Sequence, residues 1–137
     1  MTAGRAVVTG GHRRVGLAIA HALARRGLDI HLTWRTKQAD AAAAVDETEA
    51  LGVHAVAHRL ELTDVDAVRE FADRVWREAD GIDVLVNSAS VFPETPLEEL
   101  DDATWDEVLA TNLKAPFVLA QSLGLRMREA GRGCVVN

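Results

Sequence analysis

The sequence has no tyrosine, one cysteine and three prolines among its 137 residues. Because Cys134 stands alone, an internal disulfide and a multi-cysteine metal site are excluded, and the histidines show no spacing typical of metal ligands. No apolar run reaches the roughly 18 residues of a membrane-spanning helix. The net charge of -6 disfavours a broad contact with nucleic acid or an anionic membrane. No segment resembles a signal peptide, so we expect a cytoplasmic protein without a metal.

Short apolar segments alternate with longer amphipathic ones along the whole chain. Strands are predicted at 5–9, 29–34, 53–62, 82–86 and 133–137, and helices at 13–26, 38–51, 64–79 and 101–129. Short, almost wholly apolar strands between helices indicate a parallel sheet covered on both faces. We therefore predict a single α/β domain over residues 1–137, a three-layer, Rossmann-type doubly wound sheet with strand order 3-2-1-4-5. The last segment is typical of a central strand, so we expect the domain to be truncated after it.

A glycine-rich turn with two adjacent arginines follows the first predicted strand. Residues 9–16 have the sequence Thr-Gly-Gly-His-Arg-Arg-Val-Gly, in which Gly10 permits a tight turn and Gly16 allows close packing of helix and strand. Arg13 and Arg14 stand at the positive end of a helix, where each cation costs about 0.3–1 kcal/mol. Solvated surface arginines are one interpretation, but a bound phosphate group explains both charges better.

The end of the second predicted strand indicates which dinucleotide binds. A site for NAD has an acid about 20 residues after the glycines. Here that region carries Trp34, Arg35 and Thr36, with Trp34 able to border an adenosine. A guanidinium attracts a 2′-phosphate that an acid would repel, and a charged hydrogen bond contributes about 1.5–3 kcal/mol. The sequence therefore predicts NADPH rather than NADH.

Four motifs in order resemble the short-chain dehydrogenase/reductase family over the whole chain. They are residues 9–16, Glu61-Leu-Thr, Leu85-Val-Asn-Ser-Ala-Ser90, and the segment from Thr104 to Phe117 that contains an Asn in the family's active-site position. Arg14 replaces the middle glycine of the family's turn and Ser90 replaces a later one. Both replacements are similar to those of pteridine reductases.

The resemblance implies site residues. The cofactor-binding set would be Gly10, His12, Arg13, Arg14, Val15, Gly16, Trp34, Arg35, Thr36, Glu61, Leu62, Asn87, Ala89 and Ser90. Within it, Glu61 and Leu62 would flank the adenine, and Asn87, Ala89 and Ser90 would line the ribose and nicotinamide. Phe92 would stack on a flat substrate ring. The parent protein would act on a small molecule and form a homo-oligomer, a dimer or tetramer.

Asn112 would be the family's active-site Asn, which holds a water in the proton relay. An Asn inside a helix is disfavoured, since its amide competes for backbone hydrogen bonds. Pro116 cannot donate to the carbonyl of residue 112, so we expect a kink that frees it. A structural role, with the amide satisfied by neighbouring backbone, is the alternative.

The family's catalytic Ser and Tyr-x-x-x-Lys have no counterpart here, since the chain has no Tyr. We therefore expect this chain alone to be inactive. Three functions stay open: an NADPH-dependent, pteridine-reductase-like reductase of C=N or C=O groups, a carbonyl reductase of the 3-oxoacyl-carrier-protein type, and a non-catalytic NADP-binding module.

Overall fold

A computed structural model describes residues 4–137 and contains one parallel sheet of five strands. The strands are β1 (Arg5–Val8), β2 (Asp29–Trp34), β3 (Ala55–Arg59), β4 (Val84–Val86) and β5 (Cys134–Val136). Their order is β3-β2-β1-β4-β5 and every neighbouring pair is parallel, which confirms the predicted topology. Several strands are shorter than predicted, because apolar residues such as Val53, Leu60 and Ile82 lie in the loops that flank them.

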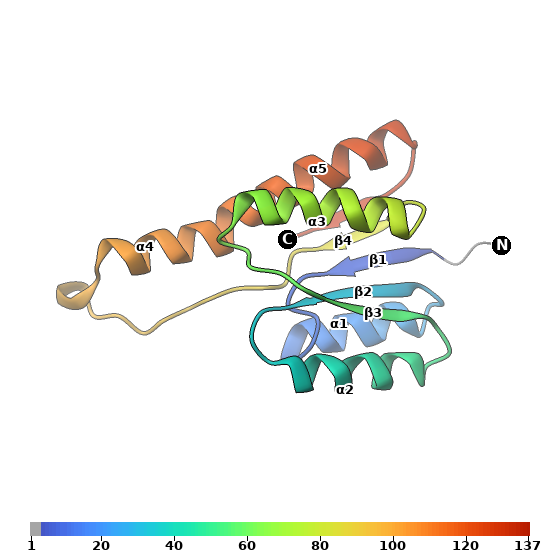
Figure 1. Ribbon diagram of the computed structural model, residues 1–137, viewed down its shortest axis with the longest axis horizontal. Helices are drawn as coiled ribbons and strands as arrows, with labels where there is room; N and C mark the ends of the chain where they lie inside the picture. Colours follow the sequence, from blue (N-terminus) through green and yellow to red (C-terminus); the bar gives the residue numbers. More distant parts are fainter. Residues whose placement is uncertain (1–3) are drawn as a thin grey trace.

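Helices cover both faces of the sheet (Figure 1). One face carries α1 (Arg14–Ala24) and α2 (Gln38–Glu49), and the other carries α3 (Val65–Glu78) and α5 (Ala115–Glu129). Side chains alternate along each strand, so β1 sends Val7 to one layer and Ala6 and Val8 to the other. Two hydrophobic cores result, one on each side of the sheet.

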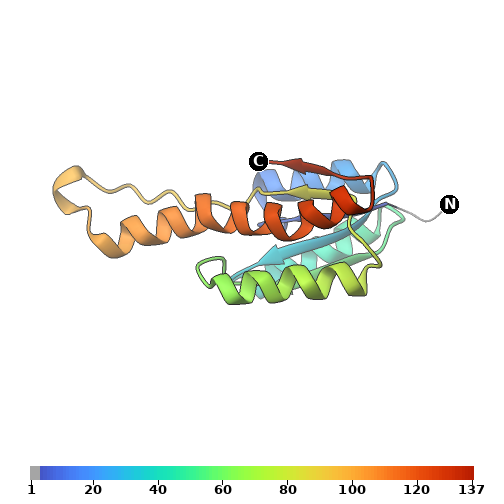
Figure 2. The ribbon, with the colours of Figure 1, turned by 90° about the horizontal axis from the view of Figure 1, so that it is seen from above.

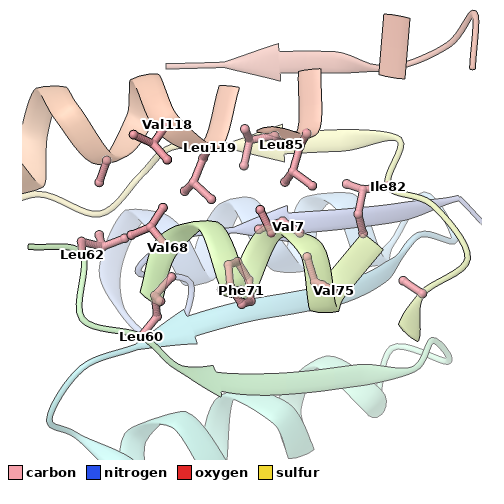
Figure 3. Packing of buried hydrophobic residues seen from close by; sticks show 14 of the residues in the cluster. Val7, Leu60, Leu62, Val68, Phe71, Val75, Ile82, Leu85, Val118 and Leu119 are labelled. Atoms are coloured by element: carbon pink, nitrogen blue, oxygen red, sulfur yellow. The ribbon is translucent and has the colours of Figure 1, made fainter. Parts of the chain in front are cut away.

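Amphipathic packing of α3 builds the first of these cores. Its buried residues Val68, Phe71, Ala72 and Val75 follow the spacing of one helical face. They meet residues of the sheet and of α5 (Figure 3), and each large side chain buried there contributes about 1.5–3 kcal/mol. The carboxylate of Asp64 accepts a hydrogen bond from the Ala67 N–H at 3.0 Å, which fixes the start of the helix.

The sheet-facing side of α1 differs from the apolar pattern of its sequence. The helical spacing of its apolar residues predicts a buried face of Val15, Ala18, Ile19, Ala22 and Leu23, but Val15 is 68% exposed. The buried residues are Gly16, Ala20 and Ala24, four apart along the helix. Small side chains let the helix axis come close to the sheet. The close approach therefore decides which face of α1 is buried, and the larger apolar residues do not.

A long helical rod extends beyond the sheet (Figures 1 and 2). It consists of α4 (Asp102–Leu109), the π-helical turn η2 (Ala110–Lys114) and α5, and it follows a short 3₁₀ turn, η1 (Leu97–Glu99). The kink predicted from Pro116 is replaced by this π turn, in which the Ala115 N–H donates to the Ala110 carbonyl. This hydrogen bond spans five residues instead of four, so one wider turn is inserted and the helix continues through the proline.

Two side chains expected inside the protein lie on its surface. A free cysteine is usually buried, yet Cys134 is exposed because β5 lies at the edge of the sheet, beside β4. A tryptophan in an amphipathic helix usually packs inward, yet Trp105 is 56% exposed on α4, which extends away from the sheet. Among residues 4–137, no helix has both the length and the apolar character needed to cross a membrane.

Candidate functional site

A pocket of about 270 Å³ opens at the carboxyl ends of the strands. In Figure 1 this is the end of the sheet beyond which α4 extends. Its lining comes from five places: residues 10 and 12–16 after β1, 33–35 at the end of β2, 60–62 after β3, 88–91 after β4, and Thr111 in η2. Ligands of doubly wound sheets bind at this edge, where the strand order reverses on either side of β1.

The structure brings most of the predicted cofactor residues to this one pocket. All of that set line it except Thr36, which is exposed beside it, and Asn87, whose side-chain N–H donates to Asn137 Oδ1 at 2.8 Å. Phe92 and Asn112 lie outside the lining. The sequence interpretation missed five lining residues, Thr33, Leu60, Ser88, Val91 and Thr111.

Backbone geometry explains the two glycines of the turn after β1. Gly10 has a φ of +63°, and a Cβ there would lie 3.0 Å from the Cα of Ala89. A Cβ on Gly16 would collide with the carbonyl oxygen of Gly10. Any larger residue would therefore push α1 away from the turn, and the cradle at the start of this helix depends on both glycines.

Two buried threonines tie the turn to the neighbouring strands. The hydroxyl oxygen of Thr9 accepts hydrogen bonds from the N–H groups of Ser88, at 3.1 Å, and Ala89, at 3.0 Å. The hydroxyl oxygen of Thr33 accepts from the Gly10 N–H at 3.1 Å. The ends of β1, β2 and β4 are thus held in one rigid arrangement. A threonine within the apolar run of residues 29–34 is the sequence signal that could have found Thr33.

The N-terminus of α1 is open to an anion. Arg13, at the N-cap, makes no side-chain capping hydrogen bond, and no acid stands in the first turn. The first N–H groups of a helix have no partner within it and attract negative charge. Arg14 lines the pocket with a φ of 49°, a left-handed conformation that costs a non-glycine residue about 1–2 kcal/mol.

His12 adds a neutral side chain to this cluster. Its Nδ1 lies 3.3 Å from the Thr33 carbonyl oxygen, so Nδ1 carries the hydrogen and donates it. Burial, joined by the charge of Arg13, lowers the pKa of His12, although the hydrogen bond to Thr33 opposes this shift. The imidazole therefore does not add to the positive charge of the arginines at neutral pH.

Two further polar groups of the lining have clear geometry. Arg35 Nη1 donates to Glu107 Oε1 on α4 at 3.1 Å. The Thr111 hydroxyl is buried and has no hydrogen-bond partner within the described part of the chain. An orphaned hydroxyl, free helix N–H groups and a glycine cradle together fit a polar ligand that carries phosphate.

Comparison with known proteins settles the family. The sequence profile described as short chain dehydrogenase matches residues 5–137. The chain belongs to the short chain dehydrogenase family. It is 36% identical over 138 residues to a gluconate 5-dehydrogenase from Gluconobacter oxydans, covering 100% of this chain and 53% of that protein.

Two further members of the family share its fold or sequence. A 3-oxoacyl-[acyl-carrier-protein] reductase from Staphylococcus epidermidis is 32% identical over 132 residues, covering 96% of this chain and 54% of that protein. A metagenomic short-chain oxidoreductase, solved in complex with NADP, superposes with a TM-score of 0.90 at 38% identity, covering 96% of this chain and 60% of that one. The chain spans about half the length of the curated relatives it matches.

Asn112, expected from the resemblance to be the family's active-site Asn, makes two hydrogen bonds to backbone in this chain. Asn112 Oδ1 accepts from the Val91 N–H at 2.9 Å, and Asn112 Nδ2 donates to the Val91 carbonyl at 2.8 Å. This pair of hydrogen bonds attaches the loop after β4 to the π turn. The side-chain amide of Asn112 is therefore satisfied by backbone.

Proposed function

We propose that this chain is the NADP-binding part of a short chain oxidoreductase that reduces a C=O or C=N group. The observation that carries the proposal is the convergence of Arg13, Arg14 and Arg35 on one pocket whose β2 end bears no acid. An acid there would bind the ribose hydroxyls of NAD, whereas a guanidinium favours the 2′-phosphate of NADP. NADP in a related solved structure supports the same cofactor.

Different residues of the pocket would contact different parts of such a cofactor. The N–H groups at the start of α1, with Arg13 and Arg14, would bind the phosphates. Glu61 and Leu62 would border the adenine, and the residues after β4 would border the nicotinamide ribose. When bound, the cofactor supplies the hydride for the reduction.

Phe92 favours a flat substrate. Its side chain is 90% exposed, in the loop that follows β4 and leads away from the pocket. An exposed aromatic ring offers a face on which a pterin could stack, with a gain of about 0.5–1.5 kcal/mol beyond area burial. The named relatives act on gluconate or 3-oxoacyl groups, which supports a carbonyl substrate as the second candidate.

Proton donation would come from outside these 137 residues. The chain has no tyrosine, and Asn112 is engaged with Val91. We therefore place binding of the cofactor in this chain and assign the complete reaction to the whole protein. A non-catalytic NADP-binding module would share the binding step and lack the reduction.

Calorimetric titration with NADP+ and NAD+ tests the proposal. We expect NADP+ to bind at least about tenfold more tightly, since each charged hydrogen bond to the 2′-phosphate contributes about 1.5–3 kcal/mol. Arg35→Met should remove most of this preference and leave NAD+ binding unchanged, whereas the control Arg128→Met, on the exposed end of α5, should change neither. Equal affinities of the unaltered chain for both dinucleotides would contradict the proposal.

A further inference from the structure

Arg35 differs from the other two arginines of the pocket in having a charged partner. Within residues 4–137, Arg13 and Arg14 form no ion pair, whereas Arg35 is held by Glu107 at 3.1 Å. The two partners lie 72 positions apart, one after β2 and one on α4. The guanidinium expected to meet a 2′-phosphate is thus already bound to a carboxylate of the same chain.

The surroundings of this pair are acidic. A second hollow lies beside the cofactor pocket and shares Arg35 and Glu61 with it. Its other lining residues are Thr63, Asp106, Glu107 and Ala110. A phosphate dianion that reaches Arg35 from the pocket therefore approaches three carboxylates, of which only Glu107 is in contact with the guanidinium.

We propose that Glu107 is a specificity-determining residue, which competes with the 2′-phosphate for Arg35 and so lowers the preference for NADP over NAD. The inference rests on the proposed function, because it requires a dinucleotide in the pocket. No contact between Glu107 and the rest of the cofactor is needed. The effect is confined to the ligand that carries the extra phosphate.

Exposure of the pair makes this competition possible. The side chains of Arg35 and Glu107 are 47% and 46% exposed, so water screens their attraction. Arg35 can therefore leave Glu107 and bind another anion at little cost. A phosphate carries more charge than a carboxylate and displaces it, but part of the binding free energy is then lost in separating the pair. Residual repulsion between the phosphate and the displaced carboxylate adds to this loss.

Glu107→Gln removes the competing charge and keeps the shape of the side chain. We expect NADP+ to bind about three- to fivefold more tightly to this variant, because exposed ion pairs of this kind contribute modestly. NAD+ binding should change less than about twofold. The matched control is Glu70→Gln, which removes one exposed acid from α3, away from the pocket, and should alter neither affinity.

A double substitution separates competition from a general change in charge. In the Arg35→Met background, Glu107→Gln should improve NADP+ binding by a clearly smaller factor, because the group for which Glu107 competes is gone and only the repulsion between carboxylate and phosphate remains. The gain from Glu107→Gln alone should also shrink as salt concentration rises. If the unaltered chain prefers NADP+ but Glu107→Gln binds NADP+ more weakly or equally well, the inference is overturned. If the unaltered chain binds NADP+ and NAD+ equally well, the proposed function is overturned, and the inference with it.

Discussion

Arg14 combines a strained backbone with a charge at the phosphate end of the pocket. Its φ of 49° is a conformation that glycine adopts without cost. We expect Arg14→Gly to raise the free energy of unfolding by about 1 kcal/mol through relief of this strain, measured by urea denaturation. The same substitution should weaken NADP+ binding, since one cation of the anion site is lost.

The neighbouring arginine supplies the control. Arg13 has an extended backbone with a φ of -159°, which any residue adopts. Arg13→Gly should therefore weaken NADP+ binding without any gain in stability. A stabilisation by Arg13→Gly as large as that by Arg14→Gly would show that backbone strain at Arg14 is not its cause.

A buried histidine pair on β2 and β3 makes stability depend on pH. His31 Nδ1 lies 3.0 Å from His58 Nε2, and the ring of His58 packs edge-on against Phe71. Burial, followed by the charges of His31 and Arg74, lowers the pKa of His58 to about 4. The unfolded chain takes up a proton near pH 6.5 and the folded chain only near pH 4, so stability falls as pH decreases between these values.

Denaturation at a series of pH values measures this contribution. We expect the free energy of unfolding to fall by at most roughly 3 kcal/mol between pH 6.5 and 4. The fall should be smaller in His58→Gln, whose side chain can still hydrogen bond to His31. His21→Gln is the control, because His21 lies on α1, which covers the opposite face of the sheet from Phe71. An unchanged pH slope in His58→Gln would contradict the assignment to this residue.

At the scale of elements, two hydrogen bonds join the π turn to the loop after β4. Asn112→Ala removes both bonds to Val91 and should make the Val91 amide exchange its hydrogen faster, with a loss of about 1 kcal/mol in stability. Lys114→Ala, on an exposed residue of the same turn, should leave that exchange unchanged. Slow exchange at Val91 in Asn112→Ala would show that the loop is held by other contacts.

The sequence predicts the elements well where the pattern is local. Alternation of short apolar and long amphipathic segments predicts the parallel strands and their order, because parallel strands need helical connections. It fails for α1, where Gly16 and Ala20 face the sheet because small residues allow close packing. It also fails for the π turn, which stands where Pro116 predicts a kink. Such details depend on what each helix packs against.

For the site, too, the sequence predicts what depends on local motifs and misses what depends on packing. Motifs along the chain predict Arg14, Arg35 and Ala89 at one pocket, since each follows a strand at the same edge of the sheet. Thr111 could not be predicted, because only the path of the helical rod brings it to the pocket. The same holds for the contact of Glu107 with Arg35.

At the scale of the whole molecule, the pocket is built from segments that border both hydrophobic cores. Its lining comes from the segments that follow β1, β2, β3 and β4 and from η2, and the cores lie on opposite faces of the sheet. A ligand that contacts all these segments stabilises only the state in which both cores are packed. Binding should therefore couple the two halves of the fold.

Thermal unfolding with and without NADP+ tests this coupling. At a concentration 100 times its dissociation constant, a ligand of the folded state adds about 2.7 kcal/mol of stability. For a domain of this size we expect a rise in Tm of about 10 °C. Hydrogen exchange should slow at Val7, in the core of α3 and α5, and equally at Ile30, in the core of α1 and α2. Slower exchange at only one of these strands would show that the two cores unfold separately and that the pocket does not connect them.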